Sequence, residues 1–417
     1  MDEKTNILWV GLVAPEEIYK ELLKKGYFHF AAQSCQKNFI EGIAECTDIK
    51  IDEISGFMMP TIPNIKEVVT KAYQWKTING GQGVSVVNLN IPYVDIVVRT
   101  YQIKRACRCW ANRHKDDNNI IFVYSAINSY LQGALEVRKI CKHTKVCLII
   151  TDLPQFMELR PSRIKKFLKN LNWHTLNKAI KDCDSWIPFT KHMISYLNLP
   201  EEKCLVIEGT VNLKHIRKNI QDIRKNIQDI RENIQDKVIV MYSGSLGLQY
   251  GIPELLNAFS QINDDNYELW FSGKGNADTL ISEYSQKDSR IKNYGFLESY
   301  EELMQVQNKA SMLINTRMPS EKASAYCFPS KMFDYMLTGK PVLTFEIKGI
   351  PEEYYQYLVV MKSTSTTDIK KAILRVGEMT NEERDAIGNR ARDFVIKYKN
   401  NIMQAQKICE FVGLGSK

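Results

Sequence analysis

Short apolar runs without strict alternation recur along the first half of the chain and predict buried β-strands. They cover residues 7–15, 49–54, 120–124, 146–151 and 185–189. Stretches with helical spacing, such as 16–25, separate most of them. Strands that are apolar on both faces and alternate with helices indicate a parallel sheet covered on both sides. The first half is therefore predicted to be a doubly wound α/β domain.

The same alternation restarts after residue 237. Strands are predicted at 238–243, 267–272, 291–294 and 311–315, and helices at 252–262, 300–308, 382–398 and 402–411. A chain of 417 residues with 44% hydrophobic content suits two cores rather than one. We expect domains at 1–207 and 237–395, a linker at 208–236, and a helix at 396–417 that returns toward the first domain.

The predicted linker contains three heptad repeats. Ile216 begins the sequence Ile-Arg-Lys-Asn-Ile-Gln-Asp, which recurs from Ile223 and nearly recurs from Ile230. Isoleucines spaced alternately four and three residues apart predict a helix of about 30 Å. Three heptads are marginal for an independent coiled coil, so we interpret them as a spacer, with self-association as the alternative.

The net charge of +8 favours phosphates or an anionic membrane surface as partners. Two basic stretches, 99–115 and 160–181, each carry a tryptophan, Trp110 and Trp173. A basic helix with an aromatic anchor suits the headgroup region of a bilayer. The alternative is a solvated surface helix whose tryptophan packs inward. No nucleic-acid recognition module accompanies the charge, so we expect no nucleic-acid partner.

Cysteine usage and hydropathy indicate the compartment. The ten cysteines show no repeated CxxC spacing, and no secretory segment precedes them, which is typical of reduced thiols in a cytosolic protein. Cys107, Cys109 and His114 lack a fourth metal ligand, and we interpret them as structural. No apolar run reaches transmembrane length, so any membrane contact is expected to be peripheral.

The stretch 328–343 carries the densest candidate chemistry and reads as loop, short helix and buried strand. Ser330 is expected at the N-cap, and Gly339 ends the helix. Free N–H groups and the helix dipole there favour a phosphate, and Lys331 adds a positive charge. Asp334 lies one turn later and suits ribose hydroxyls. The alternative is that Ser330 only caps the helix and Asp334 only complements its dipole.

Two residues of the first half follow predicted strands. Gly11 ends the first strand, and Asp152 follows the strand at 146–151. Loops at the carboxyl edge of a parallel sheet are the expected position for a ligand. For Asp152, a substrate contact and a simple turn residue are equally open.

Several motifs together resemble the group 1 (family 4) glycosyltransferases over residues 238–355. They are Tyr242-Ser-Gly-Ser-Leu-Gly, Trp270-Phe-Ser-Gly-Lys-Gly, Tyr294-Gly-Phe-Leu, Phe328-Pro-Ser-Lys-Met-Phe-Asp-Tyr-Met and Thr338-Gly-Lys-Pro-Val. In the first half, Ile150-Thr-Asp-Leu-Pro is similar to the members that build capsular and extracellular polysaccharides. The resemblance implies a GT-B fold with two Rossmann-like domains facing across a cleft. It also implies a nucleotide-sugar donor in the second domain, an acceptor in the first, retention of anomeric configuration and no metal or other cofactor.

The resemblance assigns roles residue by residue. Those implied for the donor are Gly244 and Ser245 beside the phosphates, Phe296 near the base, Ser330 and Lys331 on the pyrophosphate, and Asp334 on the ribose. The family often has a second glutamate where Tyr326 stands here, and the usual Arg and Lys of the glycine loop are missing. We infer that Lys331, Lys274 and Arg317 neutralise the phosphates instead.

The sequence thus predicts a cytoplasmic hexosyltransferase, peripheral at the inner face of the membrane, that extends a glycan or lipid-linked acceptor held near Asp152. Two alternatives are an epimerase of the same architecture and a non-catalytic nucleotide- or sugar-binding protein, which Tyr326 makes plausible. A metal-dependent transferase of the other fold type is disfavoured. The only match to its acidic motif, at Asp182 and Asp184, lies where turn residues are expected.

Overall fold

The computed structural model describes residues 4–27, 29–156, 163–214, 237–297 and 299–415, with the backbone alone for 163–171. The heptad repeats, and with them the predicted helix and its self-association, lie outside these ranges. The chain divides into two units, Met1–Thr210 with Asn401–Lys417, and Val211–Asn400. Among the described residues, none of the helices combines the length and apolar character that crossing a bilayer demands.

The described part of the first unit contains a seven-stranded sheet in the order β4-β5-β2-β1-β7-β8-β9. Its strands are β1 (Thr5–Gly11), β2 (Ile51–Ser55), β4 (Gln74–Lys76), β5 (Gln82–Ser85), β7 (Asn118–Tyr124), β8 (Thr144–Ile150) and β9 (Ser185–Pro188). All neighbours pair in parallel except β4, which runs antiparallel to β5 at one edge. The central strand β1 is almost wholly buried, because helices cover both faces of the sheet.

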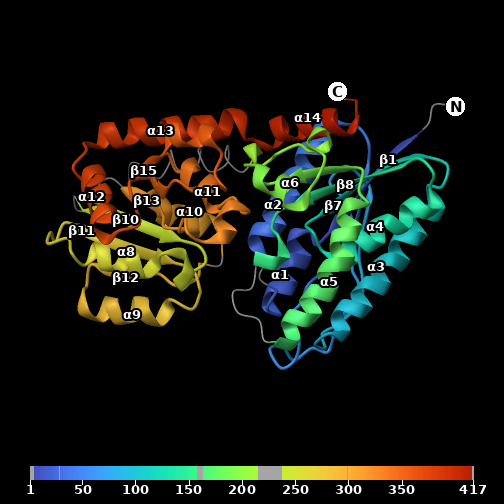
Figure 1. Cartoon of the computed structure of the whole chain (residues 1–417), viewed down its shortest axis with the longest axis horizontal. Helices are drawn as coiled ribbons and strands as arrows, with labels where there is room; N and C mark the ends of the chain where they lie inside the picture. The colour runs from blue at the N-terminus through green and yellow to red at the C-terminus, as the bar shows by residue number, and fades with distance from the viewer. Residues whose placement is uncertain (1–3, 28, 157–162, 215–236, 298, 416–417) are drawn as a thin grey trace. The chain divides into compact units, whose positions relative to one another are not determined.

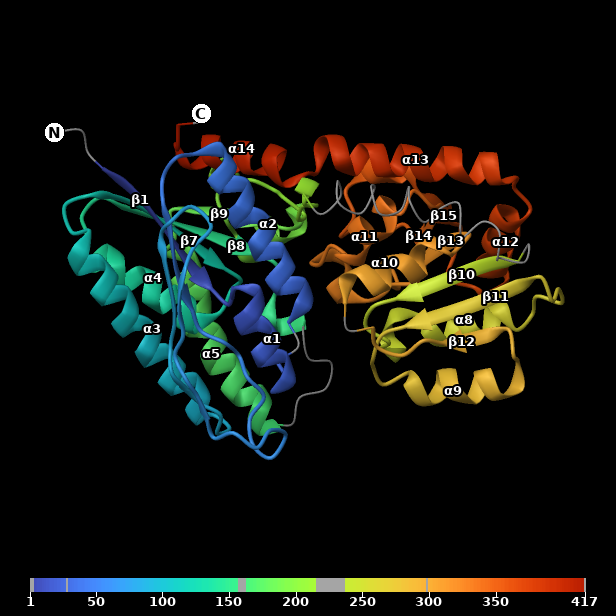
Figure 2. The same ribbon diagram turned by 180° about the vertical axis from the view of Figure 1, so that it is seen from behind.

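The helices of the first unit alternate with these strands, as Figures 1 and 2 show. They are α1 (Glu16–Lys24), α2 (Phe30–Cys46), α3 (Val94–Arg113), α4 (Asn128–Ile140), α5 (Arg163–Lys181), α6 (Lys191–Leu197) and α14 (Asn401–Val412), with short 3₁₀ turns at Pro154–Phe156 and Glu201–Lys203. The last helix, α14, packs against α2. Gly42 permits that approach, since a Cβ there would lie 2.2 Å from the backbone oxygen of Asn401.

A two-stranded antiparallel ribbon, which the apolar pattern did not predict, precedes α3. It pairs β3 (Val69–Thr70) with β6 (Asn88–Leu89). The backbone N–H of Asn90 donates to the oxygen of Val68 at 2.7 Å, and the Asn90 side chain bonds Glu67 and Thr70. This buried asparagine joins the end of β6 to β3 and so stabilises the ribbon through hydrogen bonds.

The described part of the second unit contains a six-stranded parallel sheet in the order β12-β11-β10-β13-β14-β15. Its strands are β10 (Val238–Ser243), β11 (Tyr267–Ser272), β12 (Ile291–Asn293), β13 (Met312–Asn315), β14 (Val342–Phe345) and β15 (Val359–Met361). This order, which runs outward in both directions from β10, is that of a dinucleotide-binding fold. The two sheets confirm the predicted doubly wound architecture.

Helices cover both faces of the second sheet, with α8 and α9 below it in Figure 1 and α11 and α13 above it. They are α8 (Ile252–Phe259), α9 (Asp278–Lys287), α10 (Tyr300–Asn308), α11 (Lys331–Leu337), α12 (Thr366–Gly377) and α13 (Asn381–Tyr398), with 3₁₀ turns at Leu248–Tyr250, Lys322–Ala325 and Glu352–Tyr357. The helix predicted at 252–262 ends at Phe259, and the N–H groups of Gln261 and Ile262 donate only three residues back, to Ala258 and Phe259.

Helix α11 ends as the sequence predicts. Gly339 adopts a φ of 68°, which only glycine takes without strain, and Pro341 prevents continuation. Helix α13 lies directly over this end, where a Cβ at Gly388 would lie 1.8 Å from the oxygen of Gly339. The buried face of α11 carries Met332 and Tyr335, among others, so the whole short helix is fixed by tertiary packing.

Gly42→Ala should lower the stability of the first unit. Alanine gains about 1 kcal/mol of intrinsic helix propensity over glycine. However, the backbone oxygen of Asn401 cannot move aside as a flexible side chain would, and overpacking costs about 1–3 kcal/mol. We expect a net loss in the free energy of unfolding, measured by urea titration of the full chain.

Ser34→Ala, on the exposed face of the same helix, is the matched control and should leave the stability unchanged or slightly raised. Equal stabilities of the two variants would contradict the close contact between α2 and α14.

Candidate functional site

The predicted donor-binding residues of the second unit gather at the carboxyl edge of its sheet. The chain runs outward from β10 to both sides, so the crevice between the ends of β10 and β13 is where a doubly wound sheet binds its ligand. Gly244 and Ser245 follow β10 and are exposed, and Arg317 lies two residues after the end of β13. Gly244 and Ser245 therefore lie on one side of this crevice, the topological switch point of the sheet, and Arg317 lies on the other.

Two glycines shape the loops at this edge. Gly244 has a φ of 116° and Gly273, after β11, a φ of 143°. The loops are in contact, since the N–H of Gly244 donates to the oxygen of Ser272 at 2.9 Å and a Cβ at Gly273 would meet the oxygen of Gly244 at 1.8 Å. Only glycine fits either position, and the result is an exposed backbone that a ligand can approach closely.

Lys331, the first residue of α11, reaches this loop. Its Nζ lies 3.6 Å from the centre of the Tyr242 ring, and a Cβ at Gly244 would lie 3.5 Å from the same nitrogen. Burial among these groups lowers the pKa of Lys331 well below its usual range, and the nearby charge of Arg317 lowers it further. Lys331 forms no ion pair with any described residue.

Tyr335 holds Lys331 in place, because both lie on α11. The Tyr335 hydroxyl donates to the oxygen of Ser243 at 2.9 Å and accepts from the N–H of Ser243 at 2.8 Å. Gln307 donates to the Ser243 hydroxyl at 2.8 Å. The last residue of β10 is thus bonded to α11 through one fully buried phenol.

Arg317 is the second cation of the site. Its Nε donates to the hydroxyl of Ser324 at 3.2 Å, Nη1 contacts the sulfur of Cys327 at 3.3 Å, and its guanidinium lies 5.7 Å from the Tyr250 ring centre. All these partners are neutral. Within the described ranges Arg317 has no carboxylate partner, so its charge and that of Lys331 are uncompensated.

Asp334 lies on α11 but does not pair with Lys331. Its Oδ1 accepts from the hydroxyl of Tyr300, the first residue of α10, at 3.2 Å. Burial raises the pKa of Asp334 to about 6, although the bond from Tyr300 opposes the rise. A carboxylate with one phenol partner still has acceptor capacity for further hydroxyl groups.

Ser330 occupies the predicted N-cap position of α11, but its side chain does not cap the helix. Ser330 precedes α11, but its backbone is already helical (φ −52°, ψ −31°) and its side chain makes no capping hydrogen bond. An N-cap hydroxyl must come from an extended backbone to reach the following N–H groups. Ser330 is exposed, so its hydroxyl points away from the core and stays a predicted ligand contact.

Lys274 and Phe296 lie together at the ends of β11 and β12. The Nζ of Lys274 is 4.9 Å from the centre of the Phe296 ring. The loops that carry them are joined to the glycine loop, since Leu246 donates its N–H to the oxygen of Lys274 at 3.0 Å and Gly273 donates to the oxygen of Gly295 at 2.8 Å. The structure therefore places them on the same edge of the sheet as Gly244.

Tyr326, where the family pattern often has a glutamate, lies half-buried at the end of the 3₁₀ turn Lys322–Ala325. Ser324 and Cys327, which flank it, are both partners of Arg317. A phenol cannot supply the charge of a carboxylate, so this segment serves the site by orienting Arg317.

The remaining two predicted residues, Gly11 and Asp152, lie in the first unit. A Cβ at Gly11 would lie 2.1 Å from Oε1 of Gln36, which accepts from the backbone N–H of Leu12 at 3.0 Å. Gly11 is thus required by packing. Asp152 is half-buried and close enough to Cys35 that its charge adds to the effect of burial, which raises the pKa of that thiol to about 12.

No cluster of His, Cys, Asp and Glu within the described ranges has the composition of a metal site. Cys107 is buried in α3 and Cys109 is exposed, while the ring of His114 lies 4.5 Å from that of Trp110. Asp184 accepts from the backbone N–H of Val146 at 2.8 Å, which gives it a structural role.

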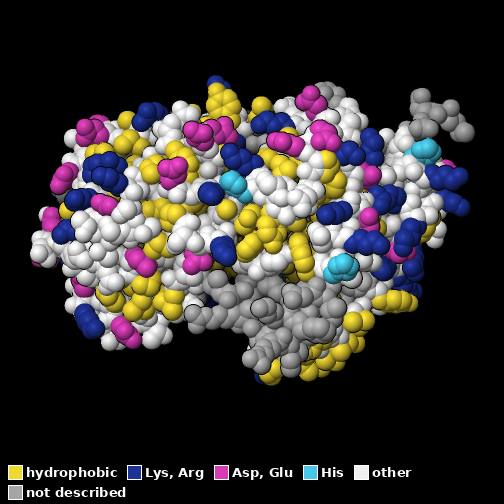
Figure 3. All heavy atoms as spheres, in the orientation of Figure 1, with side chains coloured by type: hydrophobic (Ala, Val, Ile, Leu, Met, Phe, Trp, Pro, Cys, Tyr) yellow, Lys and Arg dark blue, Asp and Glu magenta, His cyan; other side chains and the backbone are white. Residues whose placement is uncertain are grey.

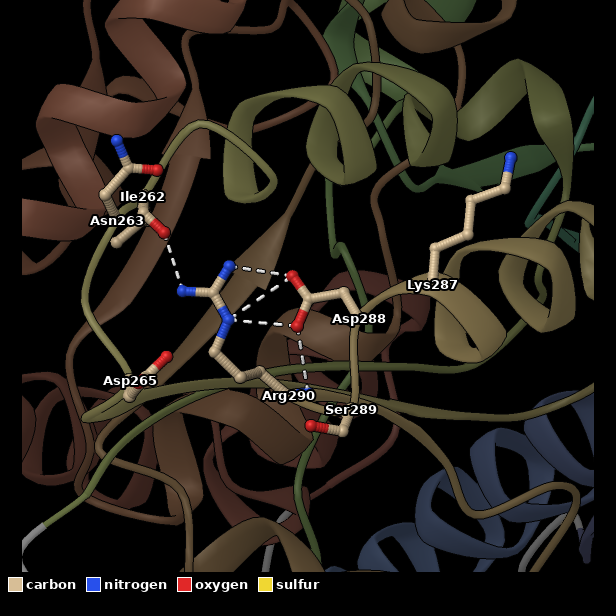
Figure 4. Close-up of a pocket in the computed structure, with 7 residues that line it drawn as sticks. All are labelled: Ile262, Asn263, Asp265, Lys287, Asp288, Ser289 and Arg290. Carbon is tan, nitrogen blue, oxygen red and sulfur yellow. Dashed lines mark hydrogen bonds and ion pairs between the residues drawn. The ribbon is translucent and has the colours of Figure 1, made fainter.

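A hollow of about 350 Å³ lies at the opposite, amino edge of the second sheet. Figure 4 shows the residues that line it, Ile262, Asn263, Asp265, Lys287, Asp288, Ser289 and Arg290. Arg290 is fully engaged there: it binds Asp288 through Nη2 at 2.7 Å and donates to the oxygens of Ile262 and Asp264. This clamp keeps the pKa of Asp288 low and ties two loops together. Asp265 and Asp288 balance Lys287 and Arg290 in its lining, so the hollow has no net positive charge to attract a phosphate.

Sequence reasoning missed Tyr242, Tyr300 and Tyr335, which position the charged side chains. Tyr335 and Tyr242 lie within the quoted motifs, but a tyrosine in an apolar run gives no sign of where its hydroxyl goes. Tyr300 is on another helix, 34 residues from Asp334 in sequence. Only the tertiary structure brings it there.

One family model matches part of the chain. The family model described as glycosyl transferases group 1 matches residues 223–394. No curated protein sequence matches the chain significantly.

Solved structures resemble the whole chain. One is HepE of Anabaena in complex with UDP-glucose, with a TM-score of 0.63 and 13% identity. The superposition includes 98% of the present chain and 99% of HepE. A second is the Escherichia coli trehalose-6-phosphate structure bound with UDP-2-fluoro glucose, with a TM-score of 0.63 and 12% identity. The superposition includes 99% of the present chain and 100% of that structure. The catalytic domain of Arabidopsis thaliana starch synthase IV, bound to ADP and acarbose, covers 98% of each chain, with a TM-score of 0.61 and 11% identity. The chain therefore has the GT-B fold, and its residues 223–394 match the model of the group 1 glycosyl transferases.

Proposed function

We propose that the chain is a retaining, metal-independent transferase that moves a hexose from a nucleoside diphosphate to a growing glycan, carried on a lipid at the inner face of the membrane. The main support for donor binding is the pair of uncompensated cations, Lys331 and Arg317. They lie beside an exposed glycine loop at the switch point of the second sheet. Two cations brought together without a carboxylate are costly unless an anion joins them. A diphosphate is an anion of suitable charge.

The leaving group is where these charges act. When the glycosidic bond to the diphosphate breaks, negative charge accumulates on the diphosphate. Lys331 and Arg317, already oriented by Tyr335 and Ser324, would stabilise that charge without a reorganisation step. This supports a role for lysine and arginine where other transferases use a metal ion.

Further support comes from the proteins of similar fold, several of which bind UDP or UDP-glucose. In the chain described here, Asp334 would accept hydrogen bonds from the ribose, with Tyr300 holding the carboxylate. Phe296 and Lys274 at the end of β12 and β11 would meet the base. Asp152 in the first unit stays the predicted contact to the acceptor.

Lys331→Ala should abolish stabilisation by the donor nucleotide. The wild type should gain melting temperature with one of UDP, GDP, ADP and CMP, equally with and without EDTA. A ligand at about 100 times its Kd adds roughly 2.7 kcal/mol. Lys348→Ala, which removes an exposed lysine, is the matched control and should respond as the wild type does. Loss of the shift on adding EDTA would contradict metal independence, and an unchanged shift in Lys331→Ala would contradict the site.

The pH dependence of nucleotide binding should report Asp334. Hydrogen bonds from ribose favour its ionised form, so affinity should rise from pH 5 to pH 7 as Asp334 ionises through its pKa of about 6. The change should approach tenfold, since roughly a tenth of the carboxyl groups are ionised one pH unit below the pKa. Phosphate also titrates near pH 6, so the difference from Asp334→Asn isolates the carboxylate.

Without nucleotide the sign is opposite. A raised pKa means that Asp334 costs stability once it ionises, so the unfolding free energy should fall as pH rises through about 6. Asp334→Asn should flatten that fall, whereas Asp393→Asn, an exposed control, should not. Parallel profiles for wild type and Asp334→Asn in both measurements would remove Asp334 from the site.

Turnover is the direct test of the reaction. With the sugar nucleotide whose base stabilises the protein and a lipid-linked glycan acceptor, we expect an extended glycan with the anomeric configuration of the donor, identified by NMR. Lys331→Ala should lower kcat by about 100-fold or more, as the loss of one preorganised group commonly does. An epimerised donor would favour the epimerase instead, and nucleotide binding without any product would favour a binding protein.

A further inference from the structure

Exposed apolar side chains concentrate in one region of the first unit. Six of them, on the ribbon and on the start of α3, are Val68, Val69, Tyr93, Val94, Val97 and Tyr101. We call these six residues the apolar tip. Val97 is 69% exposed and Tyr101 62%. These two residues are neighbours on one face of α3, and such exposure is unusual for the face of a helix that packs into a core.

The tip is one surface because the ribbon and α3 are held together. Strand β6 packs against α3, and β3 pairs with β6. The N–H of Asn90 donates to the oxygen of Val68, and the N–H of Asp95 at the start of α3 donates to the oxygen of Ile91. In Figure 3, hydrophobic side chains gather along the lower edge of this unit, below a row of Lys and Arg on its right-hand side.

One face of α3 changes from apolar to basic along its length. Val94, Val97 and Tyr101 are followed at helical spacing by Arg105 and Arg108. Lys104 and Arg105 form no ion pair with described residues, whereas Arg108 pairs with Glu136 at 3.0 Å. At 1.5 Å per residue, Val94 and Arg105 are about 16 Å apart along the axis. That separation places an apolar end in acyl chains while the charges remain among headgroups.

The membrane contact expected from the sequence had a different anchor. Trp110 is buried and donates to Asp52 at 2.8 Å, and Arg99 is buried with Asp95 as its partner at 3.3 Å. Both therefore belong to the interior, and the predicted tryptophan anchor of the 99–115 stretch is wrong. For the 160–181 stretch, Trp173 is half-buried, and the side chains of 163–171 lie outside the description.

We propose that the apolar tip inserts into the surface of an anionic bilayer, with Lys104 and Arg105 on the lipid phosphates. Insertion would bring the protein to a lipid-linked acceptor. Only this purpose of the insertion rests on the proposed function. Charge favours this occupant over a second copy of the chain, because the basic face would meet its own like charges. Tyrosine at the boundary and aliphatic groups at the end match the polarity gradient of a bilayer.

Flotation of the full chain with vesicles tests the tip. We expect binding to phosphatidylcholine vesicles that contain about a third phosphatidylglycerol, weakened by salt, and little binding to phosphatidylcholine alone. The double variant Val97→Asp with Tyr101→Asp should lose at least tenfold in partition coefficient. Lys104→Gln with Arg105→Gln should lose about 25-fold, from about fivefold for each basic residue.

Matched controls carry the same chemical changes elsewhere on the unit. Val206→Asp alters an exposed valine outside the tip, and Lys142→Gln with Lys145→Gln removes two exposed charges. Both should bind vesicles as the wild type does. Circular dichroism and the melting temperature confirm that each variant is folded.

The outcomes separate the two proposals. Vesicle binding that fails in the wild type, or that survives the aspartates at the tip, overturns the inference. A dimer by light scattering that the aspartates convert to a monomer, without vesicle binding, assigns the tip to contacts between copies and overturns it too. Nucleotide binding is measured without vesicles, so its failure alongside normal flotation rejects the proposed function and leaves the tip standing.

Discussion

The two hydrogen bonds between the Tyr335 phenol and the backbone of Ser243 determine where the charges of the second unit stand. They join α11 to the last residue of β10, and the next residue along the chain is Gly244. A helix of seven residues has little stability of its own, so its direction depends on such contacts and on its buried face. If α11 turned, Lys331 would leave the loop and Asp334 would leave Tyr300. One neutral, buried group thus positions two ionisable ones.

This arrangement is unfavourable for the empty protein. Burial makes the charged form of Lys331 less stable, and it does the same for Asp334, as the direction of each pKa shift shows. Asp334 would be a natural counter-ion for Lys331 on the same helix, yet it bonds Tyr300 instead. The cation therefore stays available for an anion and the carboxylate for hydroxyl groups. The second unit gives up stability at its sheet edge and recovers it elsewhere, for example at the Arg290 clamp on the other edge.

Much of the fold could be predicted because it depends on local patterns. Strands β10 and β11 begin and end where the apolar runs do, since parallel strands covered on both faces are mostly apolar. The glycine after β10 and the end of α11 at Gly339 follow from backbone chemistry. What could not be predicted is where side chains point. Helix α3 was recognised as basic, but whether Trp110 faces the core depends on Asp52, 58 residues earlier in sequence. Ser330 stands at the predicted N-cap position but makes no capping bond, because its backbone is helical rather than extended.

The apolar tip is a second case in which the sequence does not show where side chains point: here apolar side chains are exposed. The run from Ile91 to Val98 reads as apolar and would be assigned to a core, because a sequence does not distinguish a valine that packs from one that is exposed. In the structure Asn90 joins the two sides of the ribbon through hydrogen bonds with Glu67 and Thr70. The polar connection makes the exposure possible: a ribbon held by hydrogen bonds does not need its valines inside. Residues such as Val69 and Val97 are then free to meet another apolar phase, and the basic residues farther along α3 select a surface of negative charge.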